Sequence, residues 1–179
     1  EKLYHEKNQV RDLAMMQLML GTGIRVSECV GLNCSDVDFQ NNAIRIHRKG
    51  GKEVSIYFSD EVEQGLRAYM EERKSKIPAA GHENALFLSL QNKRMSVRTV
   101  ELMVKKYAQK VTPLKHITPH KLRSSYGTNL YQETGDIYLV ADVLGHSDVN
   151  TTKKHYAALE EERRRSVRNL VRLRKEEGE

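Results

Sequence analysis

The sequence between Ile117 and Tyr156 is ITPHKLRSSYGTNLYQETGDIYLVADVLGHSDVNTTKKHY, and the rest of the chain is organised around it. Thr118 can cap a helix and Pro119 suits a first helical position, so a helix is expected to begin there. His120 and Arg123 then lie one turn apart on the same face. Because a helix start exposes unpaired N–H groups and the positive end of the helix dipole, this pair is suited to a phosphate.

The second half of this stretch predicts two further short helices separated by a glycine turn. Gly145 closes the first helix in the left-handed conformation, His146 occupies the turn, and Ser147 caps the next helix. Tyr156 follows His146 after about three helical turns. One short helix could therefore carry the tyrosine hydroxyl back toward His146.

The composition is that of a globular domain, with 39% hydrophobic and 30% charged residues among 179 and a net charge of +6. This charge favours a polyanionic partner, although a solubilising surface charge explains it equally well on composition alone. No apolar run approaches the length of a membrane span, and the start at Glu1 shows neither a signal peptide nor an initiator Met. We expect an excised cytoplasmic domain in which Cys29 and Cys34 are packing residues.

The first part of the chain predicts a helix over residues 8–20, a stop at Gly21-Thr22-Gly23, and a second helix over residues 24–31. The apolar stripe expected to be buried on the first helix consists of Val10, Leu13, Ala14, Met16, Met19 and Leu20. Arg25 is expected in the first turn of that second helix, with Glu28 on the same face. The pair is either a surface ion pair or an anion clamp in which the carboxylate braces the guanidinium.

Residues 36–58 alternate between apolar and polar in three runs, which predicts a β-meander with a hairpin turn at Gly50-Gly51. Lys49 and Lys52 are expected to flank that turn as a cross-strand pair, either as solvated edge lysines or as part of a mobile finger that reaches a ligand. Ser59 and Ser96 are expected to cap helices that end near Lys76 and Val111. The fold class is α+β, mainly α-helical with a small three-stranded antiparallel sheet.

Several kinds of site do not fit the sequence. Pro119 starts a helix between His116 and His120, so these histidines do not share a regular helical face as metal ligands would. P-loop, dinucleotide and serine-nucleophile motifs are absent. Two arginines, a lysine, two histidines and a tyrosine remain, and they suit phosphodiester chemistry without a cofactor. The hydroxyl of Tyr156 is the only candidate nucleophile among them.

These motifs together resemble those of one known family, the tyrosine recombinases of the phage-integrase superfamily. GTGIRVSE (residues 21–28) is similar to the family's first arginine box, HKLR (120–123) to its His-x-x-Arg box, and LGH (144–146) to its third box. The segment at Tyr156 resembles the nucleophile helix, and a hairpin lysine lies between the boxes. The resemblance spans nearly the whole chain and implies the family's catalytic fold. The segment LGHSDVNTTKKHYA is most similar to integrases of conjugative transposons and related phages.

The resemblance implies a role for each matching residue, without metal or cofactor. Those that would bind phosphate and handle protons are Arg25, His120, Arg123 and His146. Glu28 would support Arg25, and Tyr156 would take the 3′ phosphate. Lys49 would be the general acid on the leaving 5′ hydroxyl, with Lys52 in reserve.

This sequence departs from the family at two points. Arg48 stands where many relatives have glycine before the lysine, which leaves the choice between the two hairpin lysines open. The interval between His146 and Tyr156 is one residue longer than in the branch that resolves chromosome dimers. This longer interval favours the integrase branch.

The implied function is a site-specific DNA recombinase or integrase that cleaves and rejoins strands through a covalent 3′-phosphotyrosine, for integration or excision of a mobile element of bacterial or phage origin. Its partners would be double-stranded DNA and further copies of itself. The copies would form a tetramer in the synapse through the tail, and no membrane partner is expected. Residues 1–179 would form a single catalytic domain, with a body of about 1–158 and a tail helix of 159–179, lacking the family's amino-terminal DNA-binding domain. The alternatives are a type IB topoisomerase, a non-catalytic DNA-binding module and a metal-dependent nuclease.

Overall fold

The computed structural model describes residues 8–168, which divide between Tyr126 and Gly127 into two compact units. Each unit is described by itself. The first unit begins with helices and a small sheet: α1 (Gln9–Thr22), α2 (Val26–Gly31), β1 (Val37–Asp38), β2 (Ala43–Arg48), β3 (Lys52–Tyr57), α3 (Asp60–Lys74) and α4 (Val97–Val111). Helix α5 (Pro119–Thr134) contains the boundary between the units. The second unit continues with α6 (Ile137–Leu144), α7 (Val149–His155) and α8 (Ala157–Ser166). The predicted fold class is confirmed, whereas the division into a body and a tail stays a prediction.

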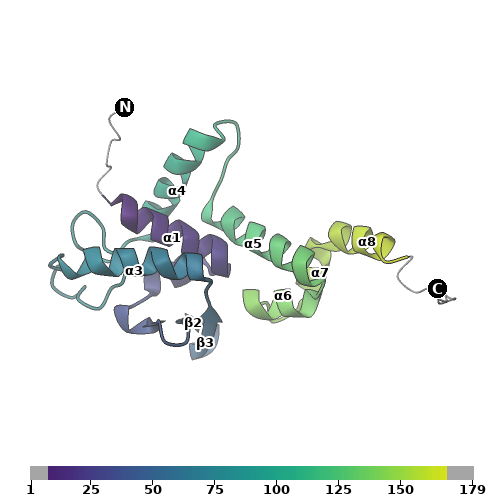
Figure 1. The fold of residues 1–179 in the computed structure, drawn as a ribbon, viewed down its shortest axis with the longest axis horizontal. Coiled ribbons are helices and arrows are strands. Elements are labelled where there is room, and N and C mark those ends of the chain that lie inside the picture. The colour runs from purple at the N-terminus through teal and green to yellow at the C-terminus, as the bar shows by residue number, and fades with distance from the viewer. Residues whose placement is uncertain (1–7, 169–179) are drawn as a thin grey trace, which may run out of the picture. The chain divides into compact units, whose positions relative to one another are not determined.

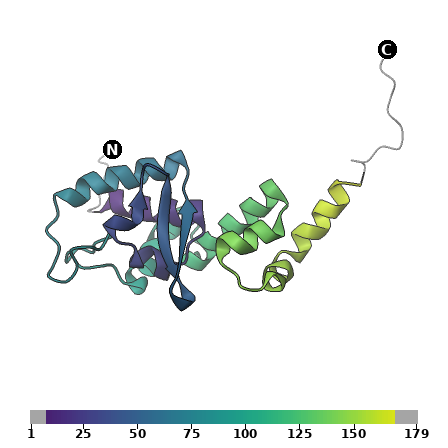
Figure 2. The ribbon, with the colours of Figure 1, turned by 90° about the horizontal axis from the view of Figure 1, so that it is seen from below.

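The sheet of the first unit is an antiparallel meander in the order β1-β2-β3, as predicted for residues 36–58. Its inner face carries apolar cross-strand pairs: Ile44 with Ile56 and Ile46 with Val54. Its outer face carries polar pairs: Arg45 with Ser55 and His47 with Glu53. Within this unit α1 and α3 pack side by side, with the sheet on one side of them and α4 on another (Figures 1 and 2). Side-chain alternation along β2 therefore decides which residues face the helices.

Helix α1 buries a face that the apolar pattern did not predict. Its buried residues are spaced three and four apart: Arg11, Asp12, Ala14, Met15, Leu18, Met19 and Thr22. Three residues of the expected apolar stripe are instead 38% to 49% exposed: Val10, Leu13 and Leu20. Arg11 and Asp12 can be buried because the guanidinium also donates to the carbonyl of Leu88 and Asp12 accepts from the hydroxyl of Tyr107. A paired and hydrogen-bonded charge thus replaces apolar residues on the inner face.

Predicted helix caps are present in α3, α4 and α5. The hydroxyl of Ser59 accepts from Val62 N–H, and that of Ser96 accepts from Thr99 N–H. Thr118 accepts from the N–H of Lys121 at the start of α5. Such hydrogen bonds satisfy amides that have no partner within the helix, so these local signals locate each helix start.

The hairpin turn between β2 and β3 uses three residues, Lys49–Gly51, rather than the two glycines alone. Gly50 and Gly51 have φ values of 82° and 74°, in the left-handed region that glycine adopts without strain. The expected cross-strand pairing of Lys49 with Lys52 is wrong, because Arg48 is the residue opposite Lys52. Lys49 instead lies in the turn and is exposed.

Tyr69 of α3 joins the helix to the core segment that precedes α4. Its fully buried hydroxyl donates to the carbonyl of Leu86 at 2.9 Å and accepts from the N–H of Leu88 at 3.1 Å. Burial of this group raises the pKa of Tyr69, so the hydroxyl stays protonated.

Replacing Tyr69 by phenylalanine is expected to lower the free energy of unfolding by about 2 to 4 kcal/mol, because it leaves two buried backbone groups without this partner. Urea denaturation followed by circular dichroism would measure the loss. Tyr57→Phe is the matched control, since Tyr57 is 70% exposed on β3. Equal stability of the two variants would contradict the expectation.

In the second unit, Gly145 ends α6 with a φ of 72°, as predicted. The expected cap at Ser147 is wrong, because Asp148 caps α7 by accepting from Asn150 N–H at 2.9 Å. Tyr156 lies at the junction of α7 and α8. In the tail helix expected over residues 159–179, the sequence predicts a narrow apolar stripe of Val167, Leu170 and Val171. Val167 is exposed, and Leu170 and Val171 lie outside the described residues.

Two further findings concern the cysteines and the helices. Cys29 and Cys34 are free, and burial raises the pKa of Cys29 to about 12, which agrees with the predicted packing role for Cys29. Between residues 8 and 168, none of the helices combines the length and apolar character needed to cross a bilayer.

Candidate active site

Arg25 and Glu28 form a braced pair at the start of α2. Arg25 is the residue immediately before the helix, because α2 begins two residues later than predicted, and its N–H donates to Glu28 Oε1 at 2.8 Å. Arg25 Nη1 lies 3.6 Å from Glu28 Oε2. The side chain of Glu28 is 5% exposed and that of Arg25 is 43% exposed, so this is not the surface ion pair considered as the alternative. A buried carboxylate supports the backbone and side chain of an arginine that solvent can still reach.

Arg48 belongs to the same cluster, and the sequence motifs did not identify it. Its Nε donates to Glu28 Oε2 at 3.2 Å, and its side chain is 8% exposed. The alternation of β2 contains the signal that could have found it, because Arg48 has the same parity as the inward-facing Ile44 and Ile46. A charged residue at an inward position requires a buried partner of opposite charge.

Arg123 joins the HKLR segment to the glycine turn that precedes Arg25. It is 7% exposed, and its Nη1 donates to the carbonyl of Gly23 at 2.5 Å. Gly23 has a φ of 69° and ends α1, so it holds this carbonyl at the turn between α1 and α2. Two motifs that are 100 residues apart in the sequence therefore meet within the first unit.

His120 is exposed at the second position of α5 and lines a cavity of about 400 Å³. The other residues around this cavity come from α2, α4 and the segment before α5: Val26, Arg98, Glu101, Leu102, Lys105, His116, Ile117, Thr118 and Pro119. The lining contains two cationic side chains, Arg98 and Lys105, and two imidazoles, but only one carboxylate, that of Glu101, so it favours an anionic ligand.

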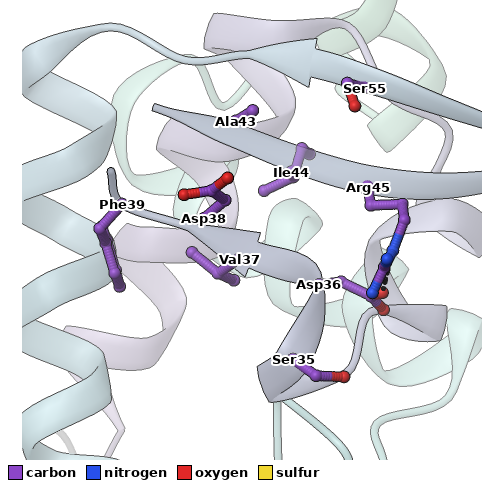
Figure 3. A pocket seen from close by; sticks show the side chains of 9 residues that line it. All are labelled: Ser35, Asp36, Val37, Asp38, Phe39, Ala43, Ile44, Arg45 and Ser55. Atoms are coloured by element: carbon purple, nitrogen blue, oxygen red, sulfur yellow. Dashed lines mark hydrogen bonds and ion pairs between the residues drawn. The ribbon is translucent and has the colours of Figure 1, made fainter. Parts of the chain in front are cut away.

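A second cavity of the first unit, of about 390 Å³, lies beside β1 and β2 (Figure 3). Arg45 extends from β2 to Asp36, with Arg45 Nε 3.3 Å from Asp36 Oδ1. None of the residues that the sequence motifs identified lines this cavity. The ion pair of Arg45 and Asp36 instead provides a comparison for that of Arg48 and Glu28, since both arginines are on β2.

His146 of the second unit has a hydroxyl partner that the sequence motifs did not identify. Its Nδ1 lies 2.6 Å from Oγ1 of Thr152, which is fully buried in α7. Thr152 precedes Tyr156 by four residues, and the N–H of Tyr156 donates to its carbonyl at 3.1 Å. Helical spacing from the tyrosine could have indicated Thr152, because residues four apart share a face. This contact fixes the orientation of the imidazole.

Tyr156 is 4% exposed and stacks on Tyr131, with ring centroids 6.0 Å apart. A Cβ atom added to Gly127 would lie 2.2 Å from the hydroxyl oxygen of Tyr156 and 3.1 Å from Leu144 Cδ1. The tyrosine hydroxyl therefore occupies space that only glycine leaves open at this position of α5.

Replacing Gly127 by alanine is expected to destabilise the chain by about 1 to 3 kcal/mol, because the new methyl group forces the buried ring of Tyr156 to move. Urea unfolding would measure this change, and Gly31→Ala is the control because no atom lies within 4 Å of an added Cβ there. Losses of the same size in both variants would show that Gly127 has no special packing role.

The predicted site residues are divided between the two units. Those of the first unit are Arg25, Glu28, Lys49, His120 and Arg123; those of the second are His146 and Tyr156. In the first unit the structure links Arg25 to Glu28 directly and brings Arg123 to the turn before Arg25. Among residues 8–168, no group of three or more His, Cys, Asp and Glu side chains could hold a metal ion.

The phage integrase family matches residues 1–163 of this chain. The chain belongs to this family. The resemblance to tyrosine recombinases inferred from the motifs is thereby confirmed. Curated relatives include tyrosine recombinase XerC of Actinobacillus pleuropneumoniae, 36% identical over 83% of this chain and 48% of the relative. Tyrosine recombinase XerD of Staphylococcus epidermidis is 34% identical over 83% of this chain and 50% of the relative. The chain spans about half the length of these curated family members.

Solved structures of family members have the same fold. XerA recombinase matches with a TM-score of 0.78 and 29% identity, covering 89% of this chain and 59% of XerA. The Tn1549 transposon integrase, solved in complex with circular intermediate DNA, matches with a TM-score of 0.67 and 27% identity, covering 85% of this chain and 55% of that one. Relatives with Xer names and a transposon integrase both appear, so the predicted conjugative-transposon branch stays a prediction.

Proposed function

We propose that this chain is the strand-cleaving part of a site-specific DNA recombinase that works through a covalent 3′-phosphotyrosine. The observation that carries the proposal is the hydrogen bond from Arg123 to Gly23, two residues before Arg25, in a member of the phage integrase family. It ties the two arginine motifs to one turn. Two guanidiniums near one phosphate would neutralise its non-bridging oxygens as charge develops on them.

The proposed reaction needs no metal or nucleotide. Tyr156 Oη forms a bond to the phosphorus, and the bond from phosphorus to the 5′ oxygen breaks. Lys49 gives a proton to that leaving oxygen. One of the two histidines, His120 or His146, accepts the proton that the hydroxyl of Tyr156 loses, and the other contributes a hydrogen bond. The phosphotyrosine keeps the energy of the broken bond, so attack by another 5′ hydroxyl rejoins the strand and releases the tyrosine.

Three features support this assignment of roles. Arg25 is braced by Glu28 and remains 43% exposed, as a group that binds a backbone phosphate must be. Lys49 is exposed in a turn with two left-handed glycines, a position that lets the ammonium reach an external ligand. The imidazole of His146 is oriented by the buried Thr152.

The partner would be double-stranded DNA, and the solved complex of the Tn1549 transposon integrase with circular intermediate DNA supports a DNA partner. We further propose that the whole protein adds an amino-terminal DNA-binding domain, assembles as a tetramer through the tail, and integrates or excises a mobile element in the bacterial cytoplasm. The length of the relatives, about twice the span of this chain, supports the additional domain.

Covalent trapping tests the proposed function. The chain, and the longer protein that carries it, would be incubated with a pool of nicked suicide duplexes randomised in their core sequence. We expect a protein–DNA product that survives denaturation, forms equally well with excess chelator, and yields a Tyr156 peptide linked to a 3′ phosphate in mass spectrometry. No covalent product from either protein would contradict the proposal.

Plasmid relaxation, chelator treatment and DNA-binding titrations separate the alternatives. A type IB topoisomerase would relax supercoiled plasmid without site preference, and a metal-dependent nuclease would lose its activity in chelator. A DNA-binding module would give no covalent product, while Arg123→Ala would lower affinity modestly and reduce the salt slope by about one.

A further inference from the structure

Arg48 occupies an inward position at the end of β2, immediately before the hairpin turn that carries Lys49. The strand alternation that turns Ile44 and Ile46 toward the helices also turns Arg48 inward, where its side chain is 8% exposed. Arg45 on the same strand points outward, and its side chain is 49% exposed. The inward arginine therefore requires an anionic partner inside the unit.

Glu28 is that partner, and its carboxylate also contacts Arg25. Oε1 accepts from the Arg25 N–H at 2.8 Å, whereas Oε2 lies 3.2 Å from Arg48 Nε and 3.6 Å from Arg25 Nη1. The shorter side-chain contact is that to Arg48. Arg48 is therefore the nearer counter-charge of the buried carboxylate, and the side chain of Arg25 remains partly exposed to solvent.

We propose that Arg48 is a positioning residue that holds Glu28 so that Arg25 can bind a phosphate. The part of this inference that concerns phosphate rests on the proposed function, whereas the coupling of the three side chains does not. Removal of Arg48 leaves Glu28 with Arg25 as its nearest cation, and a buried carboxylate draws such a cation into a closer ion pair. Arg25 would then be held by Glu28 instead of remaining available to DNA.

The same contact lies next to the turn that carries Lys49. Arg48 is the last residue of β2, and its bond to Glu28 anchors the strand beside α2 at the point where the glycine turn begins. A planar guanidinium with several donors suits this role better than an ammonium, which is a single point of charge. The arginine that replaces the glycine of many relatives thus has a structural partner in this chain.

The coupling can be measured without DNA, from solvent exchange of arginine Nε–H groups in ¹⁵N NMR. In Arg48→Met, exchange at Arg25 is expected to slow about tenfold, because Glu28 takes up its guanidinium. Arg45→Met is the matched control, since it breaks a similar ion pair with Asp36 on the same strand and should leave exchange at Arg25 unchanged. Unchanged exchange at Arg25 in Arg48→Met, or equal slowing in both variants, would overturn the inference.

Cleavage of the suicide duplexes tests the consequence for DNA. Arg48→Met is expected to lower the single-turnover rate of cleavage about tenfold, whereas Arg45→Met should leave this rate unchanged. The double variant Arg25→Ala/Arg48→Met should cleave no more slowly than Arg25→Ala alone. Additive losses would show that Arg48 does not act through Arg25. If Arg48→Met does not fold, Arg48→Lys is the second variant, because it keeps the charge. It should slow exchange at Arg25 and cleavage of DNA to a smaller extent, and wild-type values of both in Arg48→Lys would overturn the inference.

The two readouts keep the proposals distinct. If the wild-type protein forms no covalent product, the proposed function fails, while exchange at Arg25 still decides whether Arg48 and Arg25 compete for Glu28.

Discussion

Replacing Tyr156 by phenylalanine is expected to abolish covalent attachment to DNA and to leave DNA binding within about twofold of the wild-type value. The change removes one oxygen, which is the atom that forms the bond to phosphorus in the proposed reaction. The ring keeps its place, because its burial and its stacking on Tyr131 do not depend on the hydroxyl. Denaturing gels with suicide duplexes would measure attachment, and a gel-shift titration would measure affinity.

Tyr138→Phe is the control for this experiment, because Tyr138 lies in the same unit and is 62% exposed. It should form the covalent product at the wild-type rate. Covalent product from Tyr156→Phe would assign the nucleophile to another residue. Tyr126 of the HKLRSSY segment is a poor replacement, because burial raises its pKa and so disfavours the phenolate.

The elements that the sequence predicted well are those with local causes. Ser59, Ser96 and Thr118 cap helices through hydrogen bonds that span only three residues, so a short window of sequence contains both partners. Gly145 ends a helix for the same kind of reason, since only its own backbone conformation is involved. The alternation of apolar and polar residues over 36–58 was sufficient to predict the meander, because the two-residue period of the side chains and the glycines at the turn indicate the same hairpin.

Two features that the sequence analysis did not predict, the buried pair in α1 and the contact of Arg48, depend on tertiary structure. The apolar pattern of α1 could not reveal that Arg11 and Asp12 would be buried together, because their burial depends on Leu88 and Tyr107 from distant segments. Arg48 was classed as a departure from a motif, and its contact with Glu28 joins a strand to a helix 20 residues away. A local pattern can show which way such a side chain points, as the alternation of β2 does for Arg48, but it does not identify the partner in another element.

The candidate site shows the same difference between features with local causes and features that depend on tertiary structure. The motifs identified Arg25 and Arg123, but their relation through Gly23 required a fold that brings residues 100 positions apart together. The sequence motifs did not identify Thr152 or Gly127 for a different reason. Both are small residues, and their importance depends on the side chain that each one contacts.

Replacing Thr152 by valine is expected to reduce the rate of DNA cleavage by about 10- to 100-fold with little change in affinity, because it removes the hydroxyl that orients His146. Valine has nearly the shape of threonine, so the packing of this fully buried position is kept. The imidazole loses its partner at Nδ1 and can change its ring orientation or its tautomer. Single-turnover kinetics would measure the rate, and ¹⁵N shifts of the His146 ring would report the tautomer.

Two further variants distinguish orientation of His146 from damage to α7. Thr152→Ser keeps the hydroxyl but loses the methyl group, so it should recover most of the rate and the wild-type ring shifts while being less well packed. Thr151→Val makes the same chemical change at an exposed neighbouring position of the helix and should cleave as the wild type does. If α7 were merely weakened, the order would be reversed, with Thr152→Ser more impaired than Thr152→Val. This order is informative because Thr152 also accepts the N–H of Tyr156 through its carbonyl, a bond that every variant retains.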